Sequence, residues 1–196
     1  MRQPVVAGNW KMNPSTLDEA IALAEAVEIV AAESPLVTTV ICPPAIWLRD
    51  VARAAPGVLI GAQTMHDEER GAFTGETSPL MLGGIAQYVI LGHSERRQFN
   101  GETDEQVGRK VASAVAHGLF PIAAVGERAE ERRAGQTEAV VERQLRAALA
   151  GLDRLAEMGL IDRRHDDHDR RHVMLTPMSR KRSTMARPSS VSVSTT

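Results

Sequence analysis

The chain has 196 residues, of which 43% are hydrophobic and 24% charged, and this composition fits one folded domain and excludes a wholly disordered protein. Its single cysteine, Cys42, excludes an intramolecular disulfide framework, and a formal net charge of −2 argues against a dedicated nucleic-acid-binding protein. The longest apolar runs, such as Val37–Ile41 and Leu119–Val125, are too short to span a membrane, and the first residues do not form a charged-then-apolar secretion signal. We therefore expect a cytoplasmic protein that partners neither nucleic acid nor membrane.

The balance of charge changes near residue 160. Residues 1–160 contain 15 Lys and Arg against 21 Asp and Glu, whereas residues 161–196 contain 8 Lys and Arg against 4 Asp. The second stretch ends in a Ser- and Thr-rich segment without a helical or strand period, so little apolar surface offsets the entropy of ordering it. We predict a folded region over residues 1–160 and a disordered tail over residues 161–196.

Short apolar runs alternate with helical patterns over the first 160 residues. The runs are dense in Val, Ile, Leu and Ala, which is typical of strands buried on both faces of a parallel sheet. The predicted strands are Pro4–Gly8, Val37–Ile41, Val58–Ala62, Tyr88–Leu91 and Leu119–Val125. The predicted helices are Thr16–Ala32, Ala45–Ala54, a short one after Ser78-Pro79, Thr103–His117 ended by Gly118, and Thr137–Ala150 followed by Gly151.

Five strand–helix repeats predict a parallel sheet, because βαβ connections are right-handed. A doubly wound sheet and an incomplete barrel both fit this pattern. The first strand is not followed by G-x-G-x-x-G, and the sequence contains no P-loop, no zinc-ligand pair and no G-x-S-x-G elbow. The motifs therefore predict neither a cofactor nor a metal.

Asn9 and Lys11 follow the first predicted strand. Side chains two residues apart on an extended chain share a face, and an amide beside an ammonium suits a small anionic substrate. The alternative is a turn-forming Asn and a loop Lys without a functional role. This segment alone leaves both interpretations open.

His93 stands at the end of the fourth predicted strand, directly after Gly92. A histidine there can donate a proton or a hydrogen bond, and a helical turn begun by Ser94 and Glu95 would supply amides that keep the imidazole neutral. The alternative is the start of a surface helix with an Arg–Glu pair. A lone histidine favours this alternative.

Two further loops contain candidate structural or binding residues. Glu127 follows the fifth predicted strand, where we expect it to pair with Arg96 or Arg97 in a structural role. The loop Gly71–Pro79 is long for a simple connection, which favours a role in binding or in subunit contact.

Four segments occur in order along the chain: Gly8–Asn13 (GNWKMN), Gly71–Glu76 (GAFTGE), Gly92–Arg97 (GHSERR) and Val125–Glu127 (VGE). Together they closely resemble the triosephosphate isomerase family over about residues 4–152. The resemblance implies a TIM (β/α)8 barrel with active-site loops at the carboxyl ends of its strands, of which about five βα units are present here. It also implies an intramolecular aldose–ketose isomerase of glycolysis and gluconeogenesis, a cytoplasmic homodimer that interconverts dihydroxyacetone phosphate and D-glyceraldehyde 3-phosphate without a cofactor.

The resemblance also assigns roles to individual residues. Asn9 and Lys11 match the family's substrate-binding pair, and Lys11 supplies positive charge near the phosphate and the developing enediolate. His93 matches the neutral electrophile that polarises the carbonyl. Ser94 and Glu95 match residues that support the site.

The Phe73–Ser78 segment resembles the loop that docks into a partner subunit, with Thr74 near the partner's site. A homodimer is therefore the quaternary structure that the resemblance implies.

The sequence departs from the family pattern after Leu152. Ala124 stands where the family has cysteine, which is a mild change. The serious departure is that the family's Tyr-Glu-Pro-Val-Trp segment with its general-base glutamate, the Ala-Ile-Gly-Thr-Gly lid and the Gly-rich phosphate loop do not occur. We predict a truncation or frameshift after about residue 152, and no significant isomerase activity of this chain alone, because proton abstraction at carbon needs a positioned base.

Two alternatives remain, a non-catalytic remnant and a tail-mediated module that binds a metal or a partner. His165, His168 and His172 offer metal-ligand types, and Arg180–Arg182 is a small basic patch. The tail has no aromatic residue for stacking on bases, which argues against nucleic-acid binding.

Overall fold

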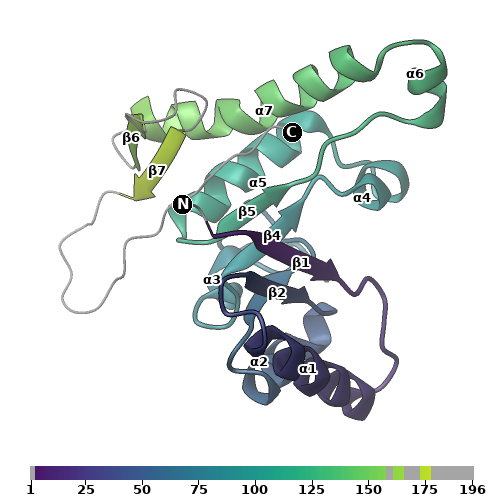
Figure 1. Ribbon diagram of the computed structural model, residues 1–196. Coiled ribbons are helices and arrows are strands. Elements are labelled where there is room, and N and C mark those ends of the chain that lie inside the picture. The colour runs from purple at the N-terminus through teal and green to yellow at the C-terminus, as the bar shows by residue number, and fades with distance from the viewer. Residues whose placement is uncertain (1–2, 158–160, 166–172, 178–196) are drawn as a thin grey trace. The chain divides into compact units, whose positions relative to one another are not determined.

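The computed structural model describes residues 3–157, 161–165 and 173–177. It divides into two compact units, Met1–Leu91 and Gly92–Thr196, and each is described by itself. From residue 5 to residue 123, each strand is separated from the next by one or two helices (Figure 1). This pattern confirms the predicted α/β class and an incomplete barrel with about five βα units.

The first unit contains four parallel strands in the order β1 (Val5–Asn9), β2 (Thr38–Cys42), β3 (Leu59–Ala62) and β4 (Tyr88–Leu91). In the register, Val5 lies opposite Thr38, Val40 opposite Leu59, and Gly61 opposite Tyr88. Because the strands are parallel, their carboxyl ends lie at one edge of the sheet. The residues that follow β1 and β3 therefore come together at that edge.

Helices of the first unit begin where the sequence provides caps. Thr16 caps α1 (Leu17–Ala32) through a capping box with Glu19, and Ser78 caps α3 (Pro79–Leu82). The pattern predicted as one helix after Pro44 is a 3₁₀ turn, η1 (Ala45–Trp47), that leads into α2 (Leu48–Ala54). Side chains between sheet and helices form the core: Val40, Val51, Ile60, Met65, Leu82, Val89 and Leu91 are all buried.

Strand β1 is an edge strand that lacks cover in the first unit. Its successive residues Val5 and Val6 are 49% and 61% exposed, although they point to opposite faces. The neighbouring β2 and β3 are mostly buried. An uncovered β1 is what an unclosed barrel predicts.

The second unit is built around the packing of α5 (Asp104–Ala116) on α7 (Thr137–Glu157). The backbones approach closely, because a Cβ on Gly151 would lie 2.2 Å from the carbonyl oxygen of Gly108. The helix predicted over Thr137–Ala150 is longer in the structure, since α7 continues through Gly151 to Glu157. The glycine is needed there for the contact between two helices.

The remaining elements of this unit are short. They are α4 (Ser94–Phe99), β5 (Phe120–Ala123) and α6 (Ala129–Arg133), together with β6 (Ile161–His165) and β7 (Val173–Pro177). β6 and β7 pair antiparallel, from Ile161 opposite Pro177 to His165 opposite Val173. Two segments of the predicted disordered tail are thus strands instead, because pairing satisfies their backbone groups. The rest of that tail lies outside the described residues.

Candidate active site

Lys11 is held in a left-handed backbone conformation just after β1. Its φ is +54°, and it is the only residue other than glycine with a positive φ in the part of the chain that the structure describes. Its N–H donates to Oδ1 of Asn9 at 2.9 Å, and its carbonyl oxygen accepts from Nε2 of Gln63 at 2.7 Å. The same Gln63 nitrogen donates to the carbonyl oxygen of Cys42 at 2.8 Å. Backbone strain of this kind costs about 1 kcal/mol or more and is typical of functional sites.

The structure thus brings Asn9 and Lys11 into contact, but by a different geometry from the predicted one. β1 ends at Asn9, so the two side chains do not extend from one strand face. The Asn9 amide instead binds the Lys11 backbone. Sequence reasoning missed Gln63, although its position directly after β3 was an available signal.

The loop that contains Thr74 is organised by an aromatic stack. The rings of His66 and Phe73 stack with centroids 3.9 Å apart, and the N–H of His66 donates to the carbonyl oxygen of Thr77 at 2.8 Å. Phe73 remains 44% exposed, and Thr74 is exposed beside it. These two contacts hold the half-exposed ring of Phe73 in a defined position on the loop.

Cys42 is buried at the end of β2. Burial raises the pKa of its thiol to about 11. The thiol is therefore uncharged at neutral pH and is not a nucleophile here.

In the second unit, His93 is the N-cap of α4. Its Nδ1 accepts the backbone N–H of Glu95 at 3.2 Å. A nitrogen that accepts this bond uses its lone pair for it, so Nε2 is the ring nitrogen that can donate. The Glu95 carboxylate lies farther away, at 3.5 Å from Nδ1. Ser94 is exposed at the first position of the helix.

Glu127 is predicted to pair with Arg96 or Arg97, but the arginine found beside it is Arg132. Oε1 of Glu127 pairs with Nε of Arg132 at 2.6 Å, because the short helix α6 brings that arginine back to the strand end. A backbone hydrogen bond and this arginine lower the pKa of Glu127. Arg97 instead pairs with Asp104.

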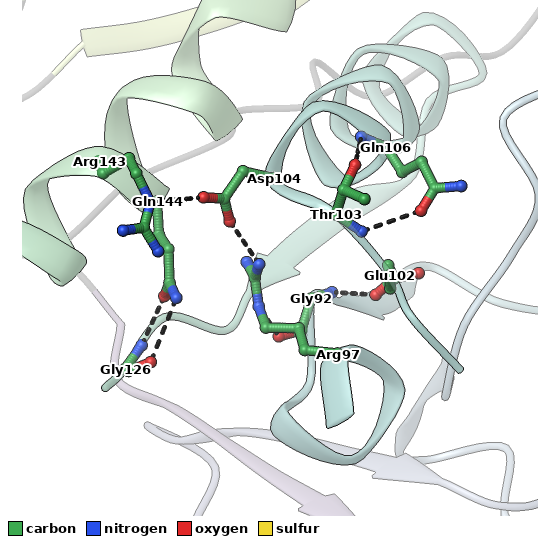
Figure 2. Close-up of polar contacts among 9 residues, drawn as sticks. All are labelled: Gly92, Arg97, Glu102, Thr103, Asp104, Gln106, Gly126, Arg143 and Gln144. Atoms are coloured by element: carbon green, nitrogen blue, oxygen red, sulfur yellow. Dashed lines mark hydrogen bonds and ion pairs between the residues drawn. The ribbon is translucent and has the colours of Figure 1, made fainter. Parts of the chain in front are cut away.

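Asp104 binds two arginines, Arg97 and Arg143, and its Oδ2 lies 2.9 Å from Nε of Arg143 (Figure 2). Partial burial acts to raise the pKa of Asp104, but hydrogen bonds from both arginines outweigh it and leave the pKa below its ordinary value. The carboxylate is therefore charged at neutral pH.

Gly126, in the loop that follows β5, is bound through both its N–H and its carbonyl oxygen by the side-chain amide of Gln144. Its N–H donates to Oε1 of Gln144 at 2.8 Å, and its carbonyl oxygen accepts from Nε2 of Gln144 at 3.2 Å (Figure 2). A hollow of about 950 Å³ lies beside it. Its charged lining consists of Arg97, Arg128 and Arg143 against Glu102, Asp104, Glu105, Glu127, Glu130 and Glu131. This excess of carboxylates does not suit a phosphate.

Among the described residues, no cluster of three or more His, Cys, Asp or Glu is placed to hold a metal ion. Of the three tail histidines, His165 lies in β6, and His168 and His172 lie outside the described residues. None of the described helices is both long and apolar enough to cross a membrane.

The model of the triosephosphate isomerase family matches residues 4–160. The chain belongs to this family. The triosephosphate isomerase match contains Asn9, Lys11, Thr74, His93 and Glu95, and it ends where the charge balance of the sequence changes. Family membership supports isomerase-like chemistry and the binding of a substrate.

Proposed function

We propose that this chain carries the carbonyl-polarising and anion-binding part of a triosephosphate isomerase site. In this proposal His93 is the electrophile, Asn9 and Lys11 bind the substrate, and Ser94 and Glu95 support His93. The observation that carries it is the bond from the Glu95 N–H to Nδ1 of His93, which makes Nε2 the ring nitrogen that donates. An N–H donor at this position can hydrogen-bond to a carbonyl oxygen as negative charge develops on it.

The chemistry assigned to these groups is charge stabilisation during enolisation. When a base removes a proton from the carbon next to the carbonyl, negative charge develops on the carbonyl oxygen. The Nε2–H of His93 hydrogen-bonds to that oxygen, and the ammonium of Lys11 stabilises the enediolate and the phosphate by its positive charge. Both groups act more strongly on the charged transition state than on the neutral ketone, so both would accelerate the reaction.

We further propose that the 196-residue chain lacks the base and does not isomerise triose phosphates by itself. The support is that the family match ends at residue 160 and that Glu157 is the last glutamate in the sequence. Glu127 is an unsuitable substitute, because its carboxylate is already paired with Arg132. General-base help alone is worth roughly 10²- to 10⁴-fold, and loss of positioning adds to this.

An infrared spectrum of bound dihydroxyacetone phosphate tests the electrophile separately from turnover. The carbonyl stretch should shift to lower frequency on the wild-type chain, and this shift should disappear in His93→Gln. Gln98→Ala, an exposed change on the same helix, is the matched control and should keep the shift. An unshifted carbonyl on a wild-type chain that binds the ligand would contradict the role of His93.

A coupled assay with the purified 196-residue chain tests the missing base. We expect no turnover above that of a chain with His93→Gln. Turnover at the rate of ordinary enzymes, on the order of 1–10³ per second, would contradict the proposal.

We also propose that the chain acts in glycolysis and gluconeogenesis in the cytoplasm and forms a homodimer through the Phe73–Ser78 loop. The stacked and half-exposed Phe73, beside Thr74, supports this contact. Sedimentation velocity should give a dimer for the wild-type chain and a monomer for Thr74→Arg. A wild-type monomer at high concentration would contradict the dimer.

A further inference from the structure

Gly92, the residue before His93, is bound on both sides by charged side chains. Its N–H donates to Oε2 of Glu102 at 3.1 Å, and its carbonyl oxygen accepts from Nε of Arg97 at 2.7 Å (Figure 2). The first bond holds the peptide plane before Gly92, and the second holds the plane after it. Together they fix both backbone dihedral angles of Gly92 and thus the direction in which the chain enters His93.

Position 92 requires glycine, and the conformational freedom of that glycine must also be restricted. The φ of Gly92 is +74°, and a Cβ there would lie 2.9 Å from Nη2 of Arg97 and 3.0 Å from the carbonyl oxygen of Ala124. Glycine is the residue that adopts this φ without strain, but it also visits many other conformations. The two side-chain bonds remove that freedom at the residue next to the proposed electrophile.

The side chains of Glu102 and Arg97 are each bound by a residue of α5. Oε1 of Glu102 accepts from Nζ of Lys110 at 2.7 Å, and these side chains are only 3% and 8% exposed. Arg97 binds Asp104, the first residue of α5. Buried ion pairs are weak stabilisers in general, because desolvation offsets their attraction. Their bonds to one glycine are therefore better explained by orientation than by stability.

We propose that Glu102 and Arg97 are positioning residues that hold His93 where its Nδ1 meets the N–H of Glu95. This inference rests on the proposed role of His93 as the electrophile. Loss of either bond to Gly92 frees the peptide that enters His93, and the ring then leaves the Glu95 amide. Neither positioning residue touches the substrate in this proposal.

Two double variants of the full chain separate the bond to Gly92 from the ion pair. Glu102→Gln/Lys110→Met keeps an acceptor for the Gly92 N–H, whereas Glu102→Leu/Lys110→Met has none, and both remove the buried charges together. The readout is the NMR coupling across the hydrogen bond between the Glu95 amide nitrogen and Nδ1 of His93. A purely structural role for the pair predicts the same coupling in both variants.

We expect the coupling in the wild-type chain and in the Gln variant and its loss in the Leu variant. Gln144→Leu is a matched control, because it removes the same kind of two-sided bond from Gly126 instead of Gly92. It should keep the coupling. A folded Leu variant with the wild-type coupling would overturn the proposal.

Arg97→Lys provides a second test, because it keeps the positive charge near Asp104 but has no Nε–H for the Gly92 carbonyl. The coupling should disappear here too. Amide hydrogen exchange in the wild-type chain tests the same point without any variant. If the bond from the Glu95 N–H to His93 depends on the two bonds that hold Gly92, the Gly92 amide must be protected from hydrogen exchange at least as strongly as the Glu95 amide. A more strongly protected Glu95 amide would overturn the proposal even if no variant folds.

These readouts need no substrate. Failure of dihydroxyacetone phosphate to show a shifted carbonyl would therefore remove the proposed function and leave the positioning result intact. Conversely, the carbonyl stretch could shift while substitutions of Glu102 and Arg97 leave the coupling unchanged. That result would contradict the positioning role of these two residues and leave the proposed function intact.

Discussion

At the scale of single residues, Lys11 combines a charged side chain with a backbone conformation that disfavours any side chain. Its left-handed φ of +54° is held by Asn9 on one side and by Gln63 on the other. The conformation is maintained by these neighbours at a cost in stability, which is typical where the direction of a side chain matters. The cost can be measured by changing this one residue.

Lys11→Gly should make the chain more stable than Lys11→Ala by about 1 kcal/mol, because glycine adopts this φ without strain. Both variants remove the ammonium, so the alanine variant controls for loss of charge. Urea unfolding at neutral pH measures the difference. Equal stabilities of the two variants would mean that Lys11 is not strained.

The Asp104 carboxylate gives a pH-dependent prediction. Its pKa is lowered in the folded chain, so its contribution to stability is full above the unfolded value, near pH 4, and is lost as the pH falls through the lower folded value. Asp104→Asn should therefore cost about 3 kcal/mol at pH 7, where it leaves two arginines without their partner. In acid, the free energies of unfolding of wild type and variant should converge. A difference that does not change with pH would contradict this account.

At the scale of elements, the contact between α5 and α7 depends on two glycines. A Cβ on Gly108 would lie 2.4 Å from the carbonyl oxygen of Ala147, and one on Gly151 would lie 2.2 Å from that of Gly108. The facing atoms are backbone, so they cannot move aside as a flexible side chain does. The helices themselves would have to separate.

Gly151→Ala should destabilise the chain by about 2 kcal/mol or more, although alanine in a helix is normally about 1 kcal/mol better than glycine. Glu142→Ala, an exposed change on the same helix, should alter stability by less than about 0.5 kcal/mol. Thermal unfolding followed by circular dichroism measures both. A more stable Gly151→Ala chain would contradict the close approach.

The long elements could be predicted from the sequence because their signals are local. The caps at Thr16 and Thr103 mark α1 and α5, and the apolar runs mark the strands to within one or two residues. Two features could not be predicted in this way: the pairing of Glu127 and the continuation of α7 through Gly151. Both depend on neighbouring residues that only the folded chain brings close. The bonds that hold Gly92 could not be predicted either, because Glu102 is ten residues away and no sequence pattern marks it as an acceptor for the Gly92 N–H.

At the scale of the whole molecule, the described residues leave apolar surface uncovered. Val5 and Val6 are exposed on opposite faces of the edge strand β1, and Ile29 and Val30 of α1 are exposed as well. Five strands cannot close an eight-stranded barrel, so such edges have no partner within a single sheet.

We therefore expect the purified 196-residue chain to be poorly soluble, because uncovered apolar edges favour aggregation. The concentration of protein that stays in solution after centrifugation measures this. A sample that remains clear and monodisperse at high concentration would contradict this expectation.

In the proposed function, this chain polarises a triose phosphate but has no carboxylate placed to remove its proton. Exchange of solvent deuterium into dihydroxyacetone phosphate, followed by NMR, is the decisive measurement, because exchange needs the base and not the complete reaction. We expect the wild-type chain and His93→Gln both to exchange no faster than buffer. Incorporation of deuterium by the wild-type chain at an enzymatic rate, abolished in His93→Gln, would show that another group is the base and would contradict the account.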